Sequence, residues 1–409
     1  MRRQLIRFPP VCGMHRLETG HLNDMRIASS WSTHADSSAA AAHALKRLIE
    51  KLGAVPSHLI LHCSAEYDCQ TIVHTISAQC PGLLVHGSTS CLGVMTEEGF
   101  HSENGLGLGM LGILHSEGAS GVGAIPLGDN PRQAAIEACI QAVRNAGRPG
   151  ELPTGLIVTS SPGVEEAVLA GIEDPFGDGV PVIGGTSADN SVSGQWKQFA
   201  GTSVFTNAVV VAAIYTNKQM VFSFQSGYLP TTHGGIVTRA NARHLYEINH
   251  RPAARVYNEW TSGLVSSVLT EGGNILRKSS LAPLGVQQTS PGKLRQFKLA
   301  HPDAVHPDGS MTLFAEVHEG QEVVLMKGTT DSLVGRLGRA VTRTKAHFGL
   351  ETNQLSGALV IFCAGCMLAI PNRMPDAVNS LRASLSGVPF LGSFAFGEQG
   401  CYWGGRNGH

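Results

Sequence analysis

Histidine is the side chain whose abundance first suggests chemistry in this sequence. The 409 residues include 18 His, well above the usual share in globular proteins, and neutral imidazole is a common ligand of metals and of haem iron. His86 ends the apolar run LLVHG, and His233 lies between Pro230 and two glycines, where a ring can point into a cavity. The sequence therefore predicts His233 and His86 as metal ligands and haem as the cofactor. The alternatives are a hydrogen-bonded core histidine for His86 and an exposed loop residue for His233.

Small hydroxyl residues and two carboxylates follow predicted strands, at the edge where open α/β sheets bind ligands. Neither GxSxG nor GxxxxGK[ST] is present, so a nucleophile elbow and a phosphate loop are excluded. We interpret the hydroxyls as a polar wall that orients a small ligand, and the carboxylates as holding a ligand amine, with loop capping as the alternative. The predicted ligand-binding residues are Ser88, Thr89, Ser90, Thr186, Ser187, Asp189 and Glu398.

Cys363 and Cys366 form a CxxC pair at the end of a predicted strand. A zinc site would lack two ligands, because no second pair accompanies it. A thioredoxin-like motif also follows the first strand of a βαβ unit, but we interpret these two residues as structural thiols. The nine Cys follow no framework, which favours reduced thiols in the cytoplasm. No activated nucleophile or acid–base pair is apparent, so we expect no enzymatic activity.

Three segments share one layout, which indicates how these residues are positioned. They are Leu59–Gly93, Gly155–Asn190 and Ala358–Gly400. Each opens with a short apolar run, continues with helical spacing, and closes with Pro, apolar residues and Gly (PGLLVHG, PVIGG, PFLGS). This pattern predicts strand–helix–strand units with parallel strands. The predicted fold class is α/β, with these repeated units in mixed sheets, two domains, and Gly87, Gly184 and Gly392 just past the second strands.

Helices are predicted over Ser37–Leu52 and Asn130–Ala146, the latter with Asn130 as N-cap and Pro131 in the first turn. A strand is predicted over Met220–Gln225, and a hairpin over 313–317 and 323–326. The predicted organisation is an N-terminal extension (1–30), a first domain (31–225) and a second domain (226–409).

Charge and hydropathy exclude several classes of protein. The 30 Lys+Arg balance 31 Asp+Glu, and no long basic run occurs, so nucleic-acid binding is not expected. The longest apolar stretches, Ala208–Tyr215 and Ala358–Ile370, are shorter than the about 18 residues that span a bilayer. Residues Met1–Gly20 contain no apolar stretch of the signal-peptide type, so we expect no signal peptide. We expect a cytoplasmic protein without membrane insertion.

Several strings resemble the FIST family of sensory proteins. In the N-terminal half these are LLVHGSTSCLGVMTEEGF (83–100) and PVIGGTSADN (181–190). In the C-terminal half they are GYLPTTHGGIVTRANARHLYEINHRPAARVYNEW (227–260), PLGV (283–286) and VPFLGSFAFGEQG (388–400). The resemblance implies a FIST N-type and a FIST C-type domain that bind a small-molecule or gaseous ligand and signal to a separate partner, such as a histidine kinase. Two-domain members without a fused output domain include nitric-oxide-sensing haemoproteins.

The sequence departs from the family pattern at a few positions. Ser393 stands where the terminal motif has Phe, Tyr228 stands where Trp is frequent, and the Arg that is frequent near Cys366 is missing. The function predicted from the resemblance is that of an intracellular sensor that binds haem or a small ligand, with nitric oxide as one candidate. A metal-free, amino-acid-like binding module is the alternative, followed by an enzyme of unknown chemistry.

Overall fold

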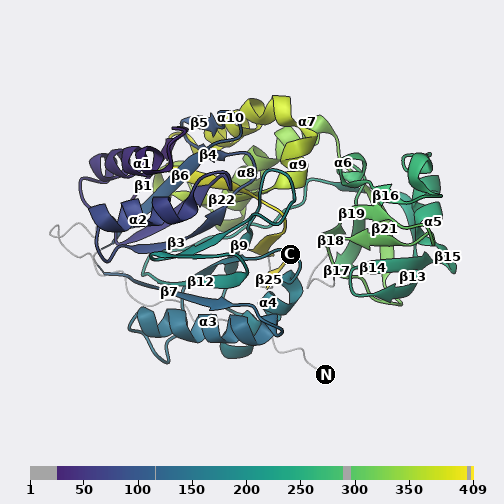
Figure 1. Ribbon diagram of the computed structural model, residues 1–409, viewed down its shortest axis with the longest axis horizontal. Helices are drawn as coiled ribbons and strands as arrows, with labels where there is room; N and C mark the ends of the chain where they lie inside the picture. The colour runs from purple at the N-terminus through teal and green to yellow at the C-terminus, as the bar shows by residue number, and fades with distance from the viewer. Residues whose placement is uncertain (1–24, 116, 289–295, 403–406) are drawn as a thin grey trace, which may run out of the picture.

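The computed structural model describes residues 25–115, 117–288, 296–402 and 407–409. A large α/β body lies beside a smaller, β-rich domain built from residues 229–327, and the chain returns to the body from residue 330 (Figure 1). The expected two-domain α/β class is confirmed.

The three predicted repeats are strand–helix–strand units in the body. They comprise β2 (His58–Cys63), α2 (Cys69–Gln79) and β3 (Leu84–Thr89); β8 (Gly155–Ser160), α4 (Glu165–Phe176) and β9 (Val182–Thr186); and β22 (Ala358–Cys363), α9 (Ala364–Ala369), α10 (Met374–Leu385) and β23 (Phe390–Ala395). The two strands of every unit are parallel neighbours. The repeat prediction is therefore confirmed.

Each repeat belongs to a different mixed sheet of the described chain. The first sheet has the order β1 (Arg26–Ser32), β6 (Leu108–Leu114), β2, β3, β10 (Gln198–Ala200), β11 (Ser203–Phe205). The second has the order β25 (Asn407–Gly408), β24 (Glu398–Cys401), β9, β8, β12 (Ala208–Tyr215), β7 (Ala119–Pro126). The third has the order β22, β23, β4 (Val94–Thr96), β5 (Gly99–His101). Strands from both ends of the chain thus share sheets, so the last repeat is built into the body.

The smaller domain holds a sheet of nine strands among the described residues. Its order is β16 (Gly273–Asn274), β19 (Pro302–Val305), β20 (Met311–Leu313), β14 (His244–Ile248), β13 (Leu229–Asn241), β21 (Glu322–Lys327), β17 (Leu284–Gln288), β18 (Gln296–Ala300), with β15 (Arg251–Pro252) beside β14. The short helices α5 (Ala253–Trp260) and α6 (Leu276–Ser279) accompany it. The predicted hairpin over 313–317 and 323–326 is wrong, because β20 pairs with β14 and β19, and β21 with β13 and β17.

Helix positions in the body follow from their caps. The helix α1 (Ser37–Leu52) begins where the Asp36 carboxylate accepts from the N–H of Ala39, and α3 (Pro131–Asn145) begins where Asn130 accepts from the N–H of Gln133. Both predicted helices are confirmed, as is Pro131 in the first turn. The remaining helices are α7 (Thr330–Val334) and α8 (Arg336–Phe348).

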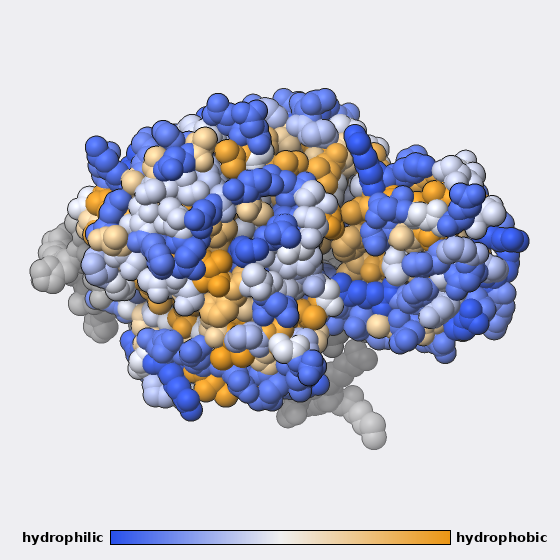
Figure 2. Space-filling view, in the orientation of Figure 1, coloured by the Kyte–Doolittle hydropathy of each residue, from blue (hydrophilic) through white to orange (hydrophobic). Residues whose placement is uncertain are grey.

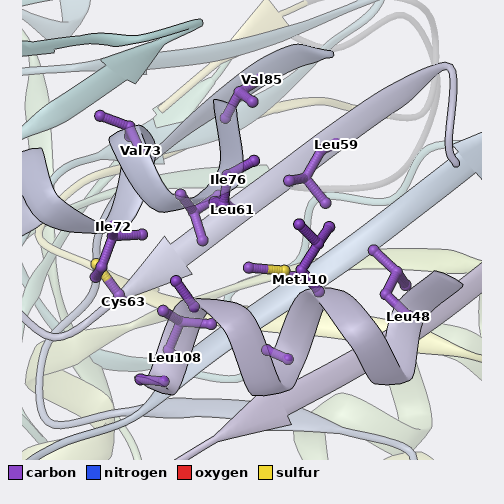
Figure 3. Close-up of a cluster of buried hydrophobic side chains, with 14 of the residues drawn as sticks. Leu48, Leu59, Leu61, Cys63, Ile72, Val73, Ile76, Val85, Leu108 and Met110 are labelled. Atoms are coloured by element: carbon purple, nitrogen blue, oxygen red, sulfur yellow. The ribbon is translucent and has the colours of Figure 1, made fainter. Parts of the chain in front are cut away.

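The strands of the first two repeats are largely buried on both faces, whereas β22 is mostly half-buried. Along β2, Leu59 and Leu61 pack against α1 and α2, as Figure 3 shows, while Ile60 points to a second core shared with Ile157 and Leu391. This second core joins residues of all three repeats. Continuous apolar runs therefore form these strands because helices cover one face and neighbouring sheets cover the other.

The three repeat glycines lie inside the second strands, not just past them as predicted. Gly87, Gly184 and Gly392 pair with residues of the first strand of their own repeats. A Cβ at Gly87 would lie 1.8 Å from the Leu61 carbonyl oxygen, and one at Gly184 would lie 1.9 Å from the Val158 carbonyl oxygen. Glycine is required here because backbone occupies the space of a side chain.

The predicted strand over Met220–Gln225 is also wrong. Residues 217–228 link the body to the smaller domain without ladder hydrogen bonds, and residues 218–226 line a cavity instead. Among the described residues, no helix has both the length and the apolar character needed to cross a membrane.

Candidate functional site

Six of the seven predicted ligand-binding residues are buried near the ends of repeat strands. They are Ser88, Thr89, Ser90, Thr186, Ser187 and Asp189. The Ser90 hydroxyl donates to the Gly93 carbonyl at 2.6 Å and accepts from the N–H of Phe394 at 2.9 Å. The Asp189 carboxylate accepts from the backbone N–H groups of residues 191, 193 and 195. These contacts fix loops, and a ligand-binding role for these residues stays a prediction.

Some of these hydroxyls surround a very small cavity where the three repeats meet. Its volume is ≈ 10 Å³, and its walls include Ser88, Thr186 and Ser393. Within the described chain, Thr186 Oγ1 has no hydrogen-bond partner. A cavity of this size matches about one water molecule, so it does not accommodate an organic ligand.

The two predicted metal ligands lie apart from each other and from any described cavity. His86 is fully buried, and its Nε2 lies 3.4 Å from the Val210 carbonyl oxygen. Burial, reinforced by the neighbouring His58 and His62, lowers the pKa of His86 to about 3. His233 is exposed on β13. The described residues contain no group of three or more His, Cys, Asp or Glu able to hold a metal ion. The structure therefore does not bring these residues together as a site.

A much larger cavity opens between the body and the smaller domain. Its volume is ≈ 610 Å³, within the range of sites for small organic ligands. Apolar side chains of all three sheets of the body form much of its wall, joined by residues 216–226, by α8, and by Phe297 and Leu299 of the smaller domain. In Figure 2, apolar surface reaches the junction of the two parts, while the smaller domain is otherwise largely hydrophilic.

Arg336, Cys366 and Glu398 interrupt this apolar wall, and Tyr228, which is not part of the wall, contacts Cys366. Arg336 at the start of α8 directs Nη1 to Cys366 Sγ at 3.6 Å, and its guanidinium carbon lies 4.8 Å from the Phe362 ring centroid. The Tyr228 hydroxyl lies 3.1 Å from the same sulfur and 2.7 Å from the Ser280 carbonyl oxygen. Because a phenol has one proton and the carbonyl contact is the shorter, the guanidinium is the clearer donor to Cys366.

The charges in this group are coupled. The hydrogen bond from the Cys363 thiol and the positive charge of Arg336 outweigh burial and lower the pKa of Cys366 to about 6. Burial and the nearby Cys366 raise the pKa of Glu398 to about 7, although Arg336 opposes this rise. Glu398, at the start of β24, lines the cavity, and its Oε1 has no hydrogen-bond partner within the described chain. Near pH 7 this part of the wall therefore combines the cation Arg336 with two groups that titrate, while Lys218 and Lys345 line the cavity elsewhere.

His301 adds an imidazole to the same wall. It follows β18, lines the cavity, and meets the Tyr228 ring edge to face at 5.8 Å. Burial and the charge of Arg336 lower the pKa of His301 to about 4, so the ring is neutral at pH 7. Neutral imidazole is the form that ligates metals.

Sequence reasoning found only Glu398 of this polar group. The CxxC pattern stands out in the sequence, but its spacing alone indicates structural thiols, and Tyr228 stands out only as a departure from the family pattern. Arg336 gave no signal, because it lies 30 positions from Cys366 on another helix. The chain lacks the Arg that the family pattern has near Cys366 in sequence, but Arg336, which is distant in sequence, contacts the Cys366 sulfur.

An ion network joins the two parts of the molecule beside the cavity. Glu166 on α4 contacts Arg243 at 2.7 Å, Lys298 at 3.6 Å and His409 at 2.8 Å, and its neighbour Glu165 also pairs with Arg243. Arg243 and Lys298 belong to the smaller domain. Burial raises the pKa of Glu166, but His409 and Arg243 reverse this and hold it well below its usual value. The network ties the smaller domain to the body.

The fold defines a two-part α/β protein with a large internal cavity. A FIST N domain matches residues 57–251, and a FIST C domain matches residues 253–401. The chain belongs to the FIST family, whose domains are sensory and bind small ligands. No curated protein matches the chain. A cyanuric acid hydrolase from A. caulinodans has 10% sequence identity, with coverage of 61% of this chain and 78% of that one, and a TM-score of 0.27, too low to inform function.

Proposed function

We propose that this chain is a sensor whose ≈ 610 Å³ cavity binds an amphipathic organic anion. The observation that carries the proposal is the position of Arg336, a cation on an otherwise largely apolar wall. Apolar walls suit the body of such a ligand, and a guanidinium suits a carboxylate head group. An amino-acid-like ligand with a large apolar side chain belongs to the same class.

The position of the cavity supports a signalling role. Its wall combines the body, the connecting residues 216–226 and the smaller domain. A ligand that binds one relative arrangement of these parts more tightly shifts the population toward it. A separate partner, such as a histidine kinase, would detect that arrangement.

Two fluorescent probes test the ligand class. One is 1-anilinonaphthalene-8-sulfonate, an aromatic anion, and the other is N-phenyl-1-naphthylamine, which has a similar body without the charge. We expect Arg336→Met to weaken the anionic probe about ten- to hundredfold, because a charge-assisted hydrogen bond contributes about 1.5–3 kcal/mol. The neutral probe should bind the variant nearly as before.

Matched variants localise the binding. Arg339→Met removes an exposed cation from the same helix and should leave both probes unaffected. Ala340→Trp, at a residue of the cavity wall, should weaken both. The proposal fails if Arg336→Met and Arg339→Met bind the anionic probe equally tightly.

Haem binding with nitric-oxide sensing is the second candidate function, and His301 favours it. His301 lies on the cavity wall, and its lowered pKa keeps the ring neutral at pH 7. The residue types fit haem: His301 would hold the iron, and Arg336 would pair with a propionate. Bound haem would supply an iron centre for nitric oxide.

A haem titration separates the histidines. If haem occupies the cavity, His301→Ala should shift or abolish the Soret band, and His233→Ala should not. If only His233→Ala loses the Soret band, His233 is the iron ligand, as predicted from the sequence. A protein that gives no Soret band with added haem would refute the haem proposal while leaving the anion proposal open.

A further inference from the structure

The CxxC pair occupies the polar end of the cavity in an arrangement that favours thiol chemistry. Cys363 and Cys366 both line the cavity, and each thiol shifts the pKa of the other. Cys363 is the N-cap of α9 and Cys366 is the third residue of that helix, a spacing that places side chains side by side. Cys366 is shielded from bulk solvent but borders the cavity, so a small oxidant can reach it there.

The neighbours of each sulfur assign different roles to the two residues. Cys366 faces the Arg336 guanidinium, which stabilises a thiolate, the nucleophilic form. Cys363 and Glu398 line the same cavity, and the neighbouring Cys366, burial and, to a smaller degree, the charge of Glu398 raise the pKa of the Cys363 thiol. Cys366 is therefore the nucleophilic thiolate, and Cys363 is a protonated thiol on the same wall as the Glu398 carboxylate.

We propose that Cys366 is a site of reversible oxidation by hydroperoxides and that Cys363 resolves the product to an intramolecular disulfide. The Cys366 thiolate attacks one peroxide oxygen, the O–O bond breaks, and the products from hydrogen peroxide are a sulfenic acid and hydroxide. Cys363 transfers its proton to Glu398 and attacks the sulfenic sulfur. Hydroxide leaves as water after taking a proton, and a 363–366 disulfide remains. The sulfurs lose two electrons in total, and peroxide gains them.

Oxidation also changes the charge that a ligand meets. A disulfide removes the negative charge of Cys366 from the vicinity of Arg336, so the guanidinium becomes available to an anionic head group. The oxidised protein should therefore bind the anionic probe several-fold more tightly than the reduced protein. This consequence rests on the proposed function, whereas the oxidation itself does not.

Peptide mapping of the full-length wild-type protein tests the site without any variant. The tryptic peptide spanning residues 346–373 contains Cys363 and Cys366 and no other cysteine. After graded hydrogen peroxide and alkylation, we expect this peptide to lose two hydrogens and both alkylation sites first. Buried Cys139, whose pKa is raised to about 12 by burial, is the internal control. Alkylation of both residues at peroxide doses that oxidise Cys139 would overturn the proposal.

Variants then separate the roles of the neighbours. Cys363→Ser should accumulate a sulfenic acid on Cys366 that dimedone traps, and Cys366→Ser should leave Cys363 reduced. Arg336→Met should slow oxidation at least about fivefold. In the wild type, the guanidinium increases the fraction of Cys366 present as thiolate by more than it lowers the nucleophilicity of that thiolate, and the variant loses this advantage. Arg336→Lys should largely retain the rate. Equal rates in Arg336→Met and wild type would refute the assigned role of the guanidinium. If the disulfide forms but the affinity for the anionic probe does not change, the coupling to ligand binding is refuted and the oxidation proposal stands.

Discussion

Replacing the repeat glycines by alanine should destabilise the fold in a graded series. The nearest atom to the added methyl is a backbone carbonyl oxygen at Gly87 (1.8 Å) and Gly184 (1.9 Å), but a Met95 side-chain atom at Gly392 (2.4 Å). Contacts under 3.0 Å force a neighbour to move, and a paired strand moves less easily than a thioether. Overpacking usually costs about 1–3 kcal/mol. We expect about 3 kcal/mol or more for Gly87→Ala and Gly184→Ala, and about 1–2 kcal/mol for Gly392→Ala.

Urea unfolding followed by circular dichroism measures this series. Gly179→Ala is the matched control, because no atom lies within 4 Å of its added methyl and its φ is not positive. Its free energy of unfolding should stay within about 0.5 kcal/mol of wild type. If Gly87→Ala and Gly184→Ala unfold at the same urea concentration as Gly179→Ala, the close approach of the two strands in each repeat is wrong.

Two further predictions concern charge. Glu166→Gln should lower the free energy of unfolding by about 1.5–3 kcal/mol, because Lys298 loses its carboxylate partner while Arg243 retains Glu165; the same substitution at exposed Glu137 should have little effect. The folded-state pKa of Glu166 is depressed, so its contribution to the free energy of unfolding is complete above the unfolded-state pKa of about 4.3 and is lost as the pH falls below that value. Urea unfolding at a series of pH values tests this, and equal acid sensitivity of Glu166→Gln and wild type would contradict it. In the cavity, deprotonation of Cys366 (pKa about 6) and Glu398 (pKa about 7) adds negative charge, so affinity for the anionic probe should fall roughly tenfold from pH 5.5 to 8. Fluorescence titration of the double variant Cys366→Ser, Glu398→Gln should show no such fall, and a persistent one would place the titrating groups elsewhere.

The sequence by itself determined the local elements of this protein. The three repeats, the helix over Ser37–Leu52 and the cap at Asn130 are confirmed, because apolar runs, helical spacing and side-chain caps act over neighbouring residues. It also gave the family, because the matching strings extend over both domains. The segment Met220–Gln225 has the apolar composition of a strand but no pairing partner, which local pattern does not reveal.

Only the tertiary structure decided where the site lies. The hydroxyls at the strand ends were expected to face a ligand, but packing of the three repeats closes that centre to a cavity of ≈ 10 Å³. The larger cavity depends on the smaller domain meeting the body, and its polar group joins residues from four separate elements. Arg336 and Cys366 are distant in sequence, and their contact alters the pKa of the thiol through an electrostatic field that depends on distance in space. Composition and spacing along the chain carry no information about such a distance.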